Sequence, residues 1–189
     1  MNNPGIRLFP PGWLVVALLV ASLALWAVLF FVTLPHLQVL AGGAAPFDAR
    51  FSGYSFEEAR AFLAAIGVEG RAYYLNPELV LDTFFPLLYA ASRALALWWL
   101  TMPERLRNGT TPGAVRWTLM AVVAVETILD LTENTCIAAM IWTWPDLAPP
   151  LVLVSSLATR LKLVAAALIE LTMLALAAVT LLRWLRART

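Results

Sequence analysis

Acidic side chains recur at helical spacing inside one of the apolar parts of the chain. Glu126, Asp130, Glu133 and Asn134 follow one another at positions i, i+4, i+7 and i+8, which places them on one face of a helix. An ionisable group in such a segment is costly unless it is paired, neutralised or hydrated. We therefore expect this face to point into the protein.

Two further polar stripes occur in the apolar segments 79–101 and 151–182. They consist of Asp82, Tyr89 and Arg93 in the first segment, and of Ser155, Thr159, Lys162 and Glu170 in the second. Counted at a rise of about 1.5 Å per residue, Arg93 and Glu126 lie at the same depth, so we expect them to pair. The same count places Lys162 level with Asp130 and Glu133, so we expect Lys162 to bridge one or both carboxylates.

The apolar segments contain more acids than bases. The acids are Asp82, Glu126, Asp130, Glu133 and Glu170, and the bases are Arg93 and Lys162, with Arg160 near the outer rim. Some carboxyl groups therefore lack a basic partner, and a buried carboxyl group in that situation tends to be protonated. This leaves three interpretations: protonated acids that donate hydrogen bonds, an acid poised to exchange protons, or a bound cation.

The sequence gives little support for a metal site or for cysteine chemistry. Oxygen atoms of Glu126, Asp130, Glu133 and Asn134 could suit a hard cation, but the only histidine, His36, lies away from the stripes. A single cysteine allows no internal disulfide and no Cys-based zinc site. We therefore expect neither a metal nor a cofactor.

The composition indicates what surrounds these stripes. Of the 189 residues, 61% are hydrophobic and 13% are charged, which is about half the charged fraction of a soluble domain. The apolar residues form four blocks, each long enough to cross a bilayer, at about 13–34, 79–101, 114–142 and 151–182. We expect an all-α, antiparallel four-helix transmembrane bundle that forms a single membrane domain over 1–189. A cleaved signal peptide is the alternative for the first block, although the block is long for one.

A polar segment, 35–76, separates the first two blocks and contains one amphipathic pattern. Ser55 and Glu58 form a capping-box motif, apolar residues follow at helical spacing, and Gly67 provides a stop. We expect a short helix on the bilayer surface, serving either as a plain connection or as a lid.

The distribution of arginine predicts the orientation. One side of the predicted bundle collects Arg7, Arg105, Arg107, Arg116, Arg183, Arg186 and Arg188. Basic residues favour the cytoplasmic side, so we expect a bacterial inner-membrane protein with both termini in the cytoplasm. A net charge of +1, with the basic residues scattered at helix ends, excludes a nucleic-acid partner.

A series of short motifs runs through the outer loop and the last three blocks. The motifs are Gly53-Tyr54-Ser55 with Glu58-Ala59, Gly70-Arg71 with Tyr73-Tyr74, Leu81-Asp82 with Phe85-Pro86 and Tyr89-Ala90, Asp130 with Glu133-Asn134, and Ala158-Thr159 with Lys162. Together they resemble the pattern of an uncharacterised family of small bacterial four-span membrane proteins, which implies no particular activity. The layout is also similar to the sterol-isomerase and sigma-2-receptor superfamily, which implies four spans around an acid-lined pocket. The buried histidine of the isomerase site has no counterpart here.

The stripes support three functional hypotheses beside a purely structural role in fixing helix register. The first is a pocket that binds a membrane lipid or another amphiphilic small molecule through Asp82, Tyr89, Arg93, Glu126, Asp130, Glu133, Asn134, Thr159 and Lys162. The second is an intramembrane enzyme in which Asp130 or Glu133 acts as general acid or base on a lipid. The third is an accessory or assembly subunit, or a homodimer, that uses its apolar outer faces as an interface.

Overall fold

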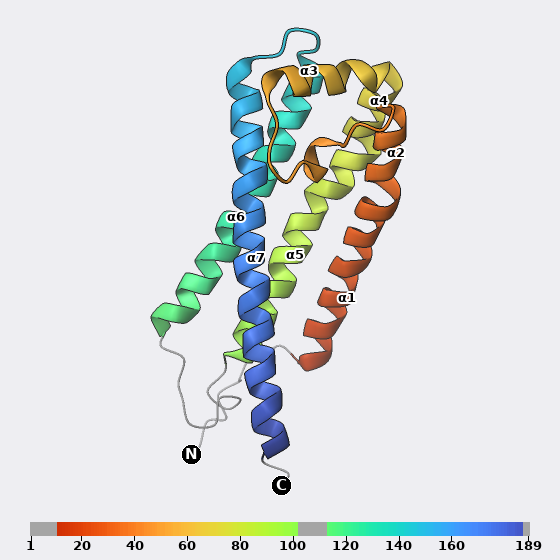
Figure 1. The fold of residues 1–189 in the computed structure, drawn as a ribbon. Coiled ribbons are helices and arrows are strands. Elements are labelled where there is room, and N and C mark those ends of the chain that lie inside the picture. The colour runs from red at the N-terminus through yellow and green to blue at the C-terminus, as the bar shows by residue number, and fades with distance from the viewer. Residues whose placement is uncertain (1–10, 102–112, 187–189) are drawn as a thin grey trace, which may run out of the picture.

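The computed structural model describes residues 11–101 and 113–186, and all regular structure in these ranges is helical. This confirms the all-α class. The long helices are α1 (Gly12–Val28), α5 (Leu79–Leu100), α6 (Gly113–Trp142) and α7 (Pro149–Arg186). Figure 1 shows α1 and α6 beginning at the end of the molecule where α5 and α7 finish.

Three helical segments of the described chain are long and apolar enough to cross a membrane: Gly12–Leu40, Gly67–Leu100 and Pro149–Arg183. Many of their apolar side chains point outward without a protein partner; Val16 on α1 is 59% exposed and Leu171 on α7 is 65% exposed. Long apolar helices with an apolar outer surface are typical of membrane proteins. Helix α6 is also long, but it carries three carboxyl groups in its central turns.

The first helix extends further than its sequence pattern predicts. We expected it to end near Pro35, but the π-helical turn η1 (Leu29–Thr33) leads directly into α2 (Leu34–Leu40). A proline inside an α-helix clashes with the carbonyl group four residues earlier. Here the wider π turn precedes Pro35, and the proline occupies the first turn of α2, where it is tolerated.

The segment between α2 and α5 contains the short helices η2 (Phe47–Ala49), α3 (Phe56–Ala65), α4 (Gly67–Tyr73) and η3 (Tyr74–Glu78). The predicted capping box begins α3: the Glu58 amide donates to Ser55 Oγ at 3.2 Å, and the Ser55 amide donates to Glu58 Oε2 at 2.7 Å. Gly67 has φ +64° and separates α3 from α4, which confirms the predicted stop. Helix α4 was not predicted.

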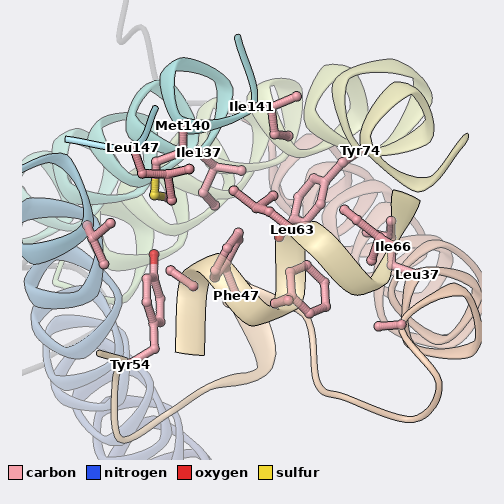
Figure 2. Packing of buried hydrophobic residues seen from close by; sticks show 14 of the residues in the cluster. Leu37, Phe47, Tyr54, Leu63, Ile66, Tyr74, Ile137, Met140, Ile141 and Leu147 are labelled. Carbon is pink, nitrogen blue, oxygen red and sulfur yellow. The ribbon is translucent and has the colours of Figure 1, made fainter. Parts of the chain in front are cut away.

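Helix α3 lies across one end of the long helices (Figure 1) and packs onto them. Its buried Phe62 and Leu63 join Phe47, Tyr74 and Ile137 in the largest apolar cluster of the described chain. Figure 2 shows Phe47, Leu63, Tyr74 and Ile137 converging from η2, α3, η3 and α6. The apolar face of α3 is therefore occupied by protein and is not free to rest on a lipid surface.

The long helices are arranged so that α1 and α7 stand on either side of α5. Helix α1 packs mainly against α5, while α7 packs mainly against α6. Small side chains at the α1–α5 contact, Ser22, Ser92 and Ala96, are all buried and allow close approach of the two helices. A groove floored by α5 is left between α1 and α7, and the candidate site lies in it.

Candidate functional site

Lys162 on α7 is the centre of a buried ionic cluster. Its Nζ lies 2.7 Å from Asp130 Oδ1 and 2.5 Å from Glu133 Oε2 on α6. This confirms the predicted bridge, which was expected to reach one or both carboxylates and reaches both. An ammonium group has three N–H donors, so it can serve two acids that lie three residues apart on one helix face. Thr159, one turn before Lys162, donates from Oγ1 to Glu133 Oε1 at 2.6 Å.

Two acids that the sequence reasoning missed extend this cluster toward α3. Asp48 in η2 lies 3.8 Å from Lys162 Nζ and accepts a hydrogen bond of 2.6 Å from the Tyr74 hydroxyl. Glu78 is buried beside Asp48 and Asp82. Glu78 precedes Asp82 by four residues, so the helical spacing on α5 could have identified it. Nothing in the loop sequence marks Asp48, because η2 has no long periodic pattern.

Asn134 has a structural partner on the neighbouring helix. Pro86 in α5 has no N–H, so the main-chain carbonyl of Asp82, four residues earlier, loses its helical hydrogen bond. The Asn134 side-chain amide donates to this carbonyl oxygen at 2.9 Å. Asn134 therefore completes the backbone hydrogen bonding of α5, and it also locks the register of α6 against α5.

The matched depths predicted that Arg93 pairs with Glu126. In the structure Arg93 pairs instead with Glu170 on α7. The Tyr89 hydroxyl donates to the same Glu170 oxygen, Oε1, at 3.1 Å. Depth along a helix does not fix the direction in which a side chain points, and α5 touches both α6 and α7. Glu126 is left buried, at 4% exposure, with Oε2 unpartnered.

A cavity of about 430 Å³ opens beside the Lys162 cluster. Its polar lining consists of Asp48, Asp82, Glu126, Asp130 and Lys162. Its apolar lining is largely aromatic and consists of Trp26, Leu29, Phe30, Leu34, Phe51, Phe85, Tyr89, Leu163 and Ala166. Helix α1, which carries none of the predicted polar stripes, supplies part of this apolar lining.

The cavity contacts only some of the predicted ligand-binding residues. Asp82, Tyr89, Glu126, Asp130 and Lys162 line it. Arg93, Glu133, Asn134 and Thr159 do not line it. Of the two carboxyl groups suggested for acid–base chemistry, therefore, Asp130 faces the cavity, whereas Glu133 lies behind Lys162 and is fully buried.

Two further cavities continue the first along the groove. The second, of about 440 Å³, shares Trp26, Phe85 and Tyr89 with the first and also contacts the Arg93–Glu170 pair. The third, of about 480 Å³, shares residues with the second and is almost wholly apolar; it lies between the start of α1 and the end of α5. The groove thus has most of its acids near α3, and the path leading away from them is apolar except for the Arg93–Glu170 pair.

The loop that carries Asp48 and Phe51 over the cavity is fastened to α7. The Tyr54 amide donates to Ser156 Oγ at 2.9 Å, and the Tyr54 hydroxyl donates to Ser155 Oγ at 2.7 Å. Burial raises the pKa of the Tyr54 hydroxyl above its usual value, so this group is a neutral donor. The loop is therefore an ordered wall of the cavity.

Several buried oxygen atoms in the site have no hydrogen-bond donor within the described chain, among them Asp82 Oδ2, Glu126 Oε2 and Asn134 Oδ1. Buried acceptors normally have partners. No group of three or more His, Cys, Asp or Glu side chains in residues 11–101 and 113–186 is arranged to hold a metal ion. The acceptors that face the cavity are thus available to a ligand that brings its own donors.

No family model, curated protein or solved structure matches this chain. The resemblance drawn from the motifs remains a prediction.

Proposed function

We propose that this chain is a four-span protein of the bacterial inner membrane that binds a lipid-like amphiphile in the groove between α1 and α7. The observation that carries the proposal is a single cavity whose lining combines four carboxyl groups and a lysine with aromatic and aliphatic side chains. A polar head and an apolar chain would each find a matching environment there.

The proposal includes α6 as a span, although its composition alone does not qualify it. Its carboxyl groups at Glu126, Asp130 and Glu133 are at most 4% exposed, whereas Val125 and Ile128 are 52% and 61% exposed. Ionisable residues in transmembrane helices face the bundle interior in this way. The outward face of α6 is therefore suited to hydrocarbon.

The proposed orientation places both termini in the cytoplasm. Arg116, Arg183 and Arg186 lie at the end of the helices opposite α3. Arg7, Arg105, Arg107 and Arg188 lie outside the described residues. This bias supports a cytoplasmic location for that end, and α3 and the acid-rich end of the groove would then lie toward the periplasm.

The position of the groove suits a ligand that comes from the bilayer. Its rims are α1 and α7, whose outer faces are apolar and exposed, so an acyl chain could pass between them without crossing a polar surface. The polar end of the ligand would rest near Asp82 and Asp130, and its chain would follow the groove toward Val15 and Ala177. The Arg93–Glu170 pair would lie beside the chain as a neutral ion pair.

Two adjacent alanines on α7 provide the test. Ala166 lines the cavity, whereas Ala167 is exposed on the outer face. We expect Ala166→Trp to fill the cavity and to abolish co-purification of a membrane lipid with the protein, measured by native mass spectrometry from nanodiscs. Ala167→Trp should retain the lipid at the wild-type level. Equal lipid occupancy in both folded variants, or none in the wild type, would overturn the proposal.

A further inference from the structure

The cavity contains an excess of hydrogen-bond acceptors that its own bases do not serve. We infer that the polar end of the bound amphiphile is a protonated amine that carries N–H groups, an inference that rests on the proposed amphiphile-binding function. The geometry that carries it is that Asp82 and Glu126 both line the cavity and that each has one buried carboxyl oxygen, Asp82 Oδ2 and Glu126 Oε2, without a donor in the described chain.

The two basic groups near the cavity are committed to other acids. Lys162 Nζ contacts Asp130 and Glu133, and Arg93 contacts Glu170. Asp82 and Glu126 are 7% and 4% exposed, and Asp82 Oδ2 and Glu126 Oε2 have no hydrogen-bond partner in the described chain. Leaving such acceptors unpaired is costly, so a ligand that supplies charged N–H donors is favoured there.

The aromatic part of the cavity lining also favours a cation. Trp26, Phe30, Phe51, Phe85 and Tyr89 line the cavity, and the Trp26 and Phe30 rings stack with their centroids 5.1 Å apart. The faces of aromatic rings carry partial negative charge and attract ammonium groups. Carboxyl groups and aromatic rings that line one cavity are the two elements of an ammonium site.

The same arrangement disfavours other head groups. A carboxylate or phosphate would bring further acceptors to a lining already rich in carboxyl oxygens, with one lysine that already contacts two acids. A quaternary ammonium would be attracted by the rings but has no N–H for Asp82 Oδ2 or Glu126 Oε2. An alcohol would supply a donor but no positive charge. The expected order of affinity is therefore the primary ammonium first and the carboxylate last.

A series of probes with one twelve-carbon chain tests this order in wild-type protein. The protein is placed in phosphatidylcholine nanodiscs, whose head groups carry no N–H, and is titrated with dodecylammonium, dodecyltrimethylammonium, 1-dodecanol and dodecanoate. The Ala166→Trp variant measures partition of each probe into the bilayer. We expect dodecylammonium to bind at least about tenfold more tightly than the others, because it alone offers charged hydrogen bonds.

Two charge-removing variants identify the wall responsible. Asp82→Asn and Glu126→Gln should each weaken dodecylammonium binding about tenfold and leave 1-dodecanol binding unchanged. Glu69→Gln, which removes an exposed carboxyl group on α4, should change neither. Unchanged dodecylammonium binding in both folded cavity variants would overturn the assignment of the site. If neither variant folds, the wild-type series decides.

The possible failures are distinguishable. If 1-dodecanol or dodecanoate binds the wild type as tightly as dodecylammonium, the amine inference is wrong and the amphiphile proposal stands. If dodecyltrimethylammonium binds equally well, the N–H requirement is wrong. If no twelve-carbon probe binds above the Ala166→Trp background, the proposed function itself fails. If butylammonium binds as tightly as dodecylammonium, the ligand is a free amine and the amphiphile is excluded.

Discussion

At the scale of single residues, Pro86 in α5 explains why the Asn134 side-chain amide on α6 donates a hydrogen bond to the α5 backbone. Pro86 leaves the Asp82 carbonyl without a helical donor, and the Asn134 amide replaces the missing bond at 2.9 Å. In hydrocarbon no water is available to take this role. The same contact holds the α5 turn from which the Asp82 side chain reaches the cavity.

This explanation predicts an energetic coupling between Asn134 and Pro86. Asn134→Leu keeps the volume of the side chain but removes the donor, so it should destabilise the protein by about 1 kcal/mol or more. In a Pro86→Ala background the alanine N–H can bond the Asp82 carbonyl, and Asn134→Leu should then cost much less. A double-mutant cycle based on unfolding in detergent measures the coupling. Additive effects of the two substitutions would contradict the explanation.

Residue partners were only partly predictable from the sequence. Helical spacing and depth were sufficient for the Lys162 bridge, because Asp130 and Glu133 occupy one face and Lys162 lies level with both. The same reasoning assigned Arg93 to Glu126, whereas its partner is Glu170. The depth of a residue follows from counting residues along its own helix. The direction in which its side chain points depends on how the helix is rotated, and this rotation is set by packing against the whole bundle.

At the scale of elements, the loop before α3 is held against α7 by a close backbone approach at Gly53. This residue has φ +81°, and a Cβ atom there would lie 2.6 Å from Ser156 Oγ and 2.8 Å from Arg160 Nε. Only glycine satisfies both the conformation and the space. The next residue, Tyr54, makes the two hydrogen bonds to α7 that fix the loop.

Gly53→Ala should therefore release the loop, whereas Gly42→Ala should not. Gly42 also has positive φ, +63°, but nothing lies within 4 Å of a Cβ atom built there. Both variants incur about 1–2 kcal/mol of backbone strain, and only Gly53→Ala adds the clash. The melting temperature should fall further for Gly53→Ala, and hydrogen exchange of the Tyr54 amide should become faster in that variant alone. Equal exchange in the two variants would show that the loop does not depend on this contact.

The elements themselves were largely predictable where local signals exist. The capping box of Ser55 and Glu58 and the positive φ at Gly67 act within a single turn, so α3 was found with its correct limits. The continuation of the first helix through Pro35 was not found, because it depends on the π turn of η1. The packing of α3 onto α6 was also missed, since it joins residues distant in sequence.

At the scale of the whole molecule, the groove and the distribution of charge both favour a bilayer location in which the apolar outer faces contact lipid and the acids lie inside the protein. Cavities follow one another between α1 and α7 from the acids to the apolar end, and the apolar rims of the groove face outward. A protein in water would leave this surface exposed to solvent, whereas lipid covers it. The acids of α6 are the exception to its apolar character, and they are buried within the molecule.

Reporter fusions at the two ends of α6 test whether it crosses the membrane. Because the α6 acids are buried and basic residues gather at the far end, we expect Asp146, in the turn before α7, to be periplasmic, and the segment 102–112 to be cytoplasmic. Alkaline phosphatase should be active only when fused after Asp146, and green fluorescent protein should fluoresce only when fused within 102–112 or after Arg186. The segment 102–112 and Asp146 lie at the two ends of α6 in the sequence. Fluorescence of green fluorescent protein fused at both of these sites would therefore mean that α6 does not span the membrane. The acid-rich end of the groove would then lose its predicted position on the periplasmic side.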